Sequence, residues 1–249
     1  MTVLGFALAL LIGVSLGLLG GGGSILTVPV LHYVLGYGVK DAIPMSLVVV
    51  GLTSGFGAIN HARAGTVRWR TALAFGPPAI VGAILGAELG LRVDATTQLT
   101  VFAVVMLLAA VSMLRGGVGA REEARPPRAR HPLPFITLVG ALVGVLTGFV
   151  GVGGGFLYVP ALALLAGLAM KEAIGTSLVL ILLSCAAGLV RYLGHLQFDW
   201  RAIALFSGIA FVGVAVGSRL VPYLSQRTLK KGFAFFLLAM GAVVLLSGR

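Results

Sequence analysis

Two glycine-rich blocks stand 131 positions apart in this chain of 249 residues, and each is followed by a proline. The first block and its proline occupy residues 17–29, and the second occupy residues 148–160. The same shift of 131 pairs Ser46 with Ser177 and Trp69 with Trp200, without a gap. The pattern therefore predicts a tandem duplication. A glycine break at the same place in both copies of an apolar unit is typical of a carrier whose site lies between the copies.

The composition indicates a lipid environment. The chain is 59% hydrophobic and only 10% charged, whereas soluble domains carry roughly 25% charged residues. Long stretches lack Asp, Glu, Lys and Arg, and most of them approach the roughly 17–25 residues that a spanning helix needs. These stretches do not alternate apolar and polar residues as strands of a membrane barrel would. We therefore expect an all-α polytopic membrane protein with about eight membrane segments.

The charge distribution and the cysteine count exclude several functions. The net charge is +11, but the basic residues cluster between apolar stretches, which is typical of cytoplasmic loops that meet anionic headgroups. We therefore expect membrane lipid and a small anionic substrate as partners, and no nucleic acid. A homodimer is the assembly that the sequence leaves open. The single Cys185 excludes an intrachain disulfide and a cysteine-based metal site. We expect no metal, no cofactor and no enzymatic activity, because no embedded Asp pair, Ser/Lys pair or metal cluster is apparent.

The duplication divides the chain into three parts. Residues 1–114 form the first membrane repeat, residues 115–131 a basic cytoplasmic linker, and residues 132–249 the second membrane repeat. Each repeat contains four apolar segments, which we place at about 3–36, 42–61, 70–91 and 96–114 in the first copy and at about 133–167, 173–192, 201–221 and 229–247 in the second. Pro126 and Pro127 prevent a helix in the linker.

The first segment of each repeat is too long for one crossing. A helix of about 34 residues would be roughly 51 Å long, against a hydrocarbon core of about 30 Å. Each repeat therefore opens with a glycine-broken helix or with a re-entrant hairpin, and non-helical backbone at that depth has to line an internal site. A single crossing would make the repeats parallel, whereas a hairpin would make them inverted. We favour inverted repeats because arms of about 15 residues match half a bilayer.

The glycine blocks are the first candidate binding site. Glycine permits positive φ and close backbone approach, so that amide groups can point at one anion, and the helix that resumes after each block presents its positive end there. The alternative is close packing of helices through small residues. The candidate residues are Gly20, Gly21, Gly22, Gly23 and Ser24 in the first block, and Gly151, Gly153, Gly154 and Gly155 in the second.

Hydroxyl groups at the start of the second segment of each repeat are the next candidates. Ser46 occupies this place in the first repeat, and Thr176 and Ser177 occupy it in the second. A hydroxyl at a helix start can donate to a ligand oxygen, cap the helix or bond back to its own backbone. The recurrence of a serine at Ser46 and Ser177 favours ligand binding.

Three polar residues follow at the end of the same segments. Asn60 and His61 end this segment in the first repeat, and Arg191, which matches Asn60 in register, ends it in the second. Segment ends lie near the headgroups, where polar side chains are tolerated, so we expect an interfacial environment. The functional alternative is that these residues line the access path to the site.

Together these motifs resemble the sulfite exporter TauE/SafE family of bacterial and archaeal membrane permeases. The resemblance rests on the pattern from Gly151 to Pro160, on Ala173 to Leu178, and on Trp69 and Trp200, and it covers nearly the whole chain. It implies a secondary carrier in the bacterial cytoplasmic (inner) membrane that moves sulfite, organosulfonates or related sulfur oxyanions by alternating access around a midplane site. An anion channel, or a carrier for a non-sulfur organic anion, is the alternative.

Overall fold

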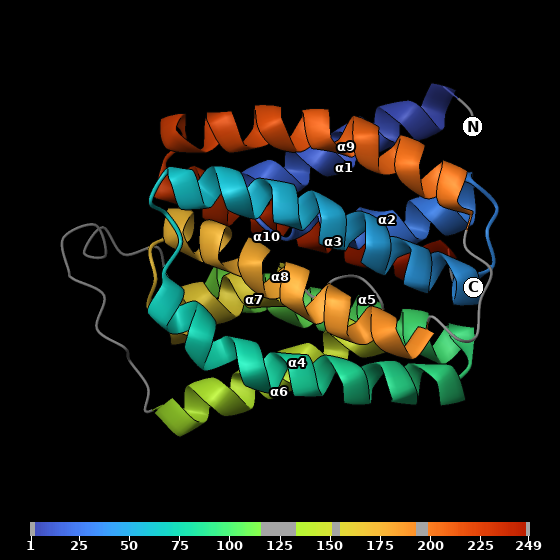
Figure 1. The fold of residues 1–249 in the computed structure, drawn as a ribbon, viewed down its shortest axis with the longest axis horizontal. Coiled ribbons are helices and arrows are strands. Elements are labelled where there is room, and N and C mark those ends of the chain that lie inside the picture. Colours follow the sequence, from blue (N-terminus) through green and yellow to red (C-terminus); the bar gives the residue numbers. More distant parts are fainter. Residues whose placement is uncertain (1–2, 116–132, 151–154, 193–198, 248–249) are drawn as a thin grey trace.

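The fold is all-helical in the part of the chain that the computed structural model describes, which is residues 3–115, 133–150, 155–192 and 199–247. The first half contains α1 (Val3–Leu19), α2 (Gly22–Pro29), the π-helical turn η1 (Val30–Val34), α3 (Val39–Arg63), α4 (Trp69–Arg92) and α5 (Ala95–Arg115). The second half contains α6 (Leu133–Val150), α7 (Gly155–Pro160), η2 (Ala161–Leu165), α8 (Met170–Tyr192), α9 (Trp200–Leu220), η3 (Val221–Tyr223) and α10 (Gln226–Ser247). The longer helices lie side by side as one bundle (Figure 1).

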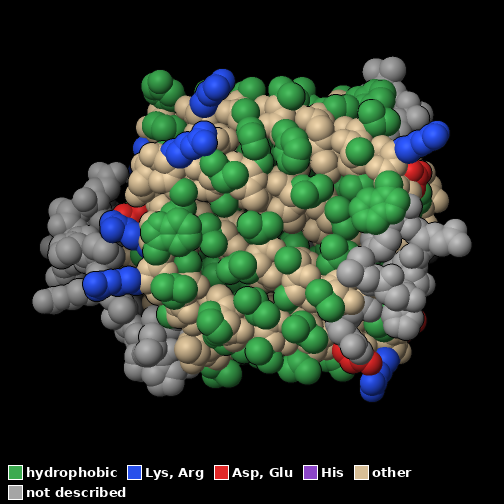
Figure 2. All heavy atoms as spheres, in the orientation of Figure 1, with side chains coloured by type: hydrophobic (Ala, Val, Ile, Leu, Met, Phe, Trp, Pro, Cys, Tyr) green, Lys and Arg blue, Asp and Glu red, His purple; other side chains and the backbone are tan. Residues whose placement is uncertain are grey.

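The bundle has the dimensions and the surface of a membrane protein. Among the described residues, five helices are long and apolar enough to cross a membrane: Val39–Arg63, Trp69–Arg92, Thr96–Leu114, Met170–Val190 and Trp200–Tyr223. Large apolar side chains cover the outside, and Leu73, Leu108 and Phe235 are 73%, 66% and 63% exposed. Figure 2 shows this apolar band across the middle of one face, with the described charged side chains toward the two ends. Such a surface requires lipid as its solvent.

The first glycine block turns the chain back on itself. α1 ends at Leu19, Gly20 has a φ of 73°, and α2 begins at Gly22. A Cβ added at Gly23 would lie only 2.2 Å from the Ile12 carbonyl oxygen, so α2 packs back along α1. In one continuous helix these two positions would be about 16 Å apart. The first segment is therefore a helical hairpin, which brings the glycine break into the interior of the bundle.

The two halves of the chain interlock. α1 packs along α9 and α6 packs along α4, so the first helix of each half lies against a helix of the other half. These contacts are close because glycines replace side chains. A Cβ at Gly86 would lie 1.9 Å from the Val145 carbonyl oxygen, and one at Gly13 would lie 2.1 Å from that of Ala210. The glycines of α1, α4, α6 and α9 therefore let helix backbones from the two halves touch.

The helix ends show how the chain is arranged along the long axis of the bundle. α1 begins and α10 ends at the same end of the bundle, on the right in Figure 1. α5 ends and α6 begins at the opposite end, on the left in the same view. The second half of the chain thus starts at the end opposite to the one at which the first half starts.

Candidate functional site

The first glycine block forms a buried break between α1 and α2. Gly20, Gly21, Gly23 and Ser24 are all buried, and the Gly20 amide donates to the Leu16 carbonyl over 2.9 Å. Gly21 is the N-cap of α2 and offers no side chain to its amide groups. The Ser24 hydroxyl donates to the Gly21 carbonyl at 2.6 Å. The break therefore exposes the positive end of α2 to the interior of the bundle without a side-chain cap.

Ser177 of the second half lies directly against this break. A Cβ added at Gly20 would be 2.8 Å from Ser177 Oγ and 2.8 Å from Ile174 Cα. Only glycine fits there, because Gly20 combines positive φ with this close approach. Two of the candidate residues, one from each half of the chain, are thus in contact.

Both candidate serines are fully buried and bond to their own helices. Ser177 donates to the Ile174 carbonyl at 2.8 Å, and Ser46 donates to the Ile43 carbonyl at 2.7 Å. These are the back-bonds that the sequence left open as the alternative to ligand binding. A hydroxyl in this arrangement can still accept a hydrogen bond. It can donate to a ligand only after its side chain rotates away from the carbonyl.

Thr176 links the two halves through the backbone. Its hydroxyl oxygen accepts a hydrogen bond from the Arg68 amide at 2.9 Å, just before α4 begins. A Cβ at Gly175 would lie 2.8 Å from the hydroxyl of Thr66, so the start of α8 rests on the turn that connects α3 to α4. In this conformation Thr176 stabilises the contact between the halves.

His61 lies inside the protein, contrary to the interfacial environment that its position at a segment end suggests. It is 3% exposed, and its Nδ1 atom lies 3.0 Å from the Thr66 hydroxyl. Among the described residues its Nε2 atom has no hydrogen-bond partner. The segment end is covered because α8 packs on α3 and on the turn after it. Asn60 is half-buried on the same turn of α3, and Arg191 lies in the last turn of α8.

The second glycine block falls largely outside the described residues. The residues that the structure does not describe include Gly151, Gly153 and Gly154, whereas Gly155 is the first residue of α7. At the end of α6, the Gln98 amide donates to the Phe149 carbonyl at 2.7 Å and the Tyr192 hydroxyl to the Gly148 carbonyl at 3.3 Å. Sequence reasoning missed both donors. Gln98 stands out as an amide within an apolar segment, and Tyr192 matches His61 in the 131-residue register.

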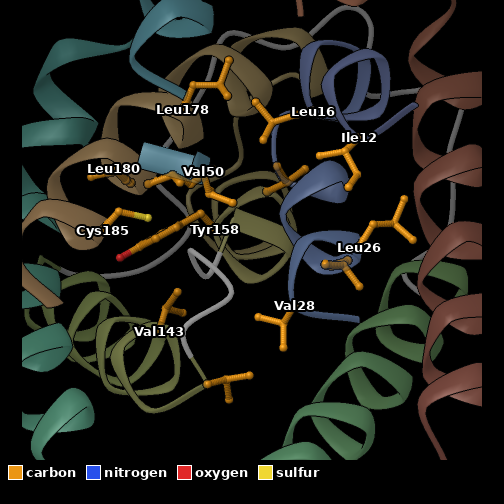
Figure 3. Close-up of a cluster of buried hydrophobic side chains, with 14 of the residues drawn as sticks. Ile12, Leu16, Leu26, Val28, Val50, Val143, Tyr158, Leu178, Leu180 and Cys185 are labelled. Carbon is orange, nitrogen blue, oxygen red and sulfur yellow. The ribbon is translucent and has the colours of Figure 1, made fainter. Parts of the chain in front are cut away.

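A buried polar pair adjoins the second break. The Tyr158 hydroxyl of α7 lies 2.6 Å from the Ser184 hydroxyl of α8, and both residues are fully buried. In Figure 3 the Tyr158 ring lies among Val50, Leu180 and Cys185, with its hydroxyl at the edge of this apolar cluster. Nothing in the sequence pattern marked this pair, because Tyr158 falls within the apolar run after the glycines.

Polar contacts join the two halves just beyond each end of α3. After its end, Arg68 forms an ion pair with Glu172 of α8. Before its start, the Tyr37 hydroxyl donates to Asp199, the N-cap of α9, at 2.7 Å. Burial and the Asp199 carboxylate raise the pKa of Tyr37 to about 12. The Ala202 amide, followed by the Tyr37 hydroxyl, lowers the pKa of Asp199.

The charged and metal-ligating side chains of the described residues limit how the break could attract a ligand. They contain no group of three or more His, Cys, Asp and Glu side chains that could hold a metal ion. None of their fully buried polar side chains is a lysine or an arginine. Attraction for a negative charge at the break would therefore come from backbone amides, the end of α2 and neighbouring hydroxyl groups.

Comparison with known proteins connects this arrangement to membrane transport. The model of a family described as "Sulfite exporter TauE/SafE" matches residues 5–244. A "Probable membrane transporter protein" of Xylella fastidiosa (strain Temecula1) is 34% identical over 247 residues, which covers 94% of this chain and 91% of the relative. A probable membrane transporter of Methanocaldococcus jannaschii is 29% identical over 75% of this chain and 72% of its own length. YdhB of Bacillus subtilis (strain 168), with the same description, is 24% identical over 95% and 96% of the two chains.

Proposed function

Since the chain belongs to the sulfite exporter TauE/SafE family of membrane proteins, we propose that it is a secondary carrier for small sulfur oxyanions such as sulfite or organosulfonates. The proposed location is the bacterial cytoplasmic membrane, with the basic linker on the cytoplasmic side. The anion is bound between the two repeats and is released on either side by alternating access. The family description supports the sulfur oxyanion as the substrate class, and the relatives support transport.

The contact between Gly20 and Ser177 is the observation that carries this proposal. It joins a break with positive φ in the first half to a buried hydroxyl in the second half. An anion held at this contact would accept hydrogen bonds from the amide groups at the start of α2. It would also accept one from the Ser177 hydroxyl after the Ser177 side chain rotates. A change in how the halves pack would then alter the site and its access together.

Inverted repeats supply the two conformations that alternating access needs. The second half of the chain starts at the end opposite to the first, and the α1–α9 contact corresponds to the α6–α4 contact under the shift of 131. These observations support an arrangement in which the halves exchange roles when the protein turns from one side of the membrane to the other. The ion pair Arg68–Glu172 and the hydrogen bond Tyr37–Asp199 would then close opposite sides of the membrane.

Cysteine labelling tests the orientation of the repeats. Single cysteines replace Arg92, the last residue of α4, and Ser225, just before α10, in a Cys185→Ser background. Inverted repeats place these two positions on opposite sides of the membrane, so an impermeant reagent added outside intact cells labels Arg92→Cys alone. Parallel repeats place both positions outside. Equal labelling of both would contradict the inverted arrangement.

Binding and flux measurements test the substrate class and the site. The purified protein is reconstituted into liposomes, and counterflow of labelled sulfite or an alkanesulfonate is compared with that of carboxylates. Ser177→Ala removes a hydrogen bond to a charged group, worth roughly 1.5–3 kcal/mol, and we expect affinity to fall about 10- to 150-fold. Ser15→Ala is the matched control, because Ser15 is also buried and bonded to its own helix, at 2.7 Å from the Leu11 carbonyl. If Ser177→Ala binds the anion with unchanged affinity, the proposed binding site is wrong.

A further inference from the structure

His61 contacts α8 and α1 near the two residues of the Gly20–Ser177 contact. On α8, a Cβ at Gly175 would be 3.2 Å from the His61 Cβ, and Gly175 lies in the same turn as Ser177 but on another face of the helix. On α1, His61 interacts with the backbone of Gly17, which lies one turn before Gly20. The imidazole is therefore separated from the proposed anion position by about one helical turn.

The hydrogen bonds of His61 are compatible with a proton on either ring nitrogen when the ring is neutral. The Thr66 hydroxyl lies 3.0 Å from both Nδ1 and the His61 carbonyl oxygen. If Thr66 donates to the carbonyl, its oxygen accepts from an Nδ1–H group; if it donates to Nδ1, the ring proton is on Nε2. In both forms, Nε2 is buried without a hydrogen-bond partner among the described residues.

The Nε2 atom of His61 is buried and unpaired. No described residue donates to it or accepts from it. A buried polar atom without a partner costs about 1–3 kcal/mol. A bound anion that accepts from an Nε2–H group removes this cost, and a second proton on the ring creates a buried positive charge that needs an anion nearby.

The described surroundings of His61 supply no free anion. α1 carries no charged residue, and the charged residues at this end of α3, α8, α9 and the turn after α3 are mostly basic: Arg63, Arg68, Lys171, Glu172 and Arg219. Glu172, the acidic member of this set, forms its ion pair with Arg68. An anion bound at the Gly20–Ser177 contact would therefore be the counter-ion of the protonated imidazole.

We propose that the His61 ring takes up a proton when the anion binds, so that the Nε2–H group of the imidazolium contributes to the binding site. This inference rests on the proposed function, because it needs the anion at the Gly20–Ser177 contact. The second repeat has Tyr192 at the matching position, where its hydroxyl donates to the Gly148 carbonyl, the match of Gly17. The ordinary pKa of a tyrosine is about 10, so of these two matching residues only His61 changes its protonation near neutral pH.

The pH dependence of binding tests this role. The probe is methanesulfonate, because sulfonic acids are strong acids and the charge of the probe is constant across the range, whereas sulfite itself titrates. If binding takes up one proton at His61, the affinity is highest at low pH and falls by up to about tenfold per pH unit as pH rises above the pKa of the free site. Calorimetry in two buffers of different ionisation enthalpy should give an uptake of close to one proton per anion.

Variants at the two matching positions separate the proton site from general effects. His61→Gln keeps a polar side chain that cannot titrate, and His61→Tyr introduces the residue of the second repeat. Both variants should bind methanesulfonate without proton uptake and with an affinity independent of pH. Tyr192→Phe is the control, and its binding should keep the pH dependence of the parent. Binding by the parent that does not vary with pH, or pH dependence that survives in both His61 variants, would overturn this inference alone. Absence of binding of any sulfur oxyanion by the parent at every pH overturns the proposed function, and this inference with it.

Discussion

Replacement of Gly20 by alanine tests whether the two halves of the chain meet closely at the first break. Gly20 has a φ of 73°, and an L-residue in this conformation costs about 1–2 kcal/mol. The new Cβ would also lie 2.8 Å from Ile174 Cα and Ser177 Oγ, well inside van der Waals contact. Overpacking of this kind costs about 1–3 kcal/mol. Gly20→Ala should therefore destabilise the protein by about 2–5 kcal/mol in total.

A second glycine of the same conformation separates strain from collision. Gly36 has a φ of 77°, but an added Cβ would meet nothing within 4 Å. Gly36→Ala should therefore be destabilised only by the backbone strain, which costs about 1–2 kcal/mol. Thermal unfolding of both variants in the same detergent measures the difference. Equal melting temperatures for the two variants would refute the close contact at Gly20.

The double variant shows which neighbour causes the collision. Ser177→Ala removes the oxygen that the new methyl group would strike, but it leaves Ile174 Cα in place. Gly20→Ala should therefore cost less in a Ser177→Ala background, with a coupling energy of about 0.5–3 kcal/mol. Strictly additive melting shifts would mean that Ile174 alone opposes the methyl group.

Further predictions concern the packing of the helices and the contacts at the ends of the bundle. Gly86→Ala should destabilise the protein by about 1–3 kcal/mol or more in thermal unfolding, because a Cβ there would lie 1.9 Å from a backbone oxygen of α6. Gly208→Ala, where an added Cβ meets nothing within 4 Å, should be neutral or stabilising by up to about 1 kcal/mol, and a larger loss there than at Gly86 would contradict the packing. Because the pKa of Asp199 is lowered in the folded state, its ionised carboxylate stabilises the fold at pH values above 3.8, the ordinary pKa of the group. This contribution is lost as pH falls through the folded pKa. The pKa of Tyr37 is raised to about 12 in the folded state, so its neutral hydroxyl stabilises the fold at pH values below 10. This contribution is lost as pH rises from 10 toward 12. Tyr37→Phe should therefore flatten the alkaline arm of the melting temperature against pH and reduce the acid arm, and an unchanged profile would show that the pair does not contribute.

The sequence predicts the helical class and the first break because both depend on local features. Apolar stretches of sufficient length predict membrane helices, and the glycine run at residues 20–23 marks where α1 ends and α2 begins. The family resemblance, drawn from the motif between Gly151 and Pro160, is confirmed by the match over residues 5–244. The equivalence of the two repeats, the number of crossings and the role of the glycines in binding stay predictions.

The contacts at the site could not be predicted, because they join residues far apart in the chain. Gly20 meets Ser177 only after α2 folds back along α1 and α8 packs beside it. His61 was expected near the headgroups, and it is buried because the start of α8 covers the end of α3. The alignment of the repeats compares positions and gives no information about which helix of the other half will cover them.

The chemistry at the two breaks differs although their positions match in the register. At the end of α6, the carbonyls of Gly148 and Phe149 accept from Tyr192 and Gln98, so side chains already satisfy this helix end. Near the matching end of α1, His61 stands at the position that Tyr192 has in the second half, and its Nε2 atom has no hydrogen-bond partner among the described residues. A polar group that is buried without a partner costs free energy and is retained where a ligand or a proton completes it. Substitution of His61 near the first break should therefore change anion binding more than stability. Loss of Gln98 or Tyr192 beside the second break should lower stability through an unsatisfied carbonyl, by about 1–3 kcal/mol.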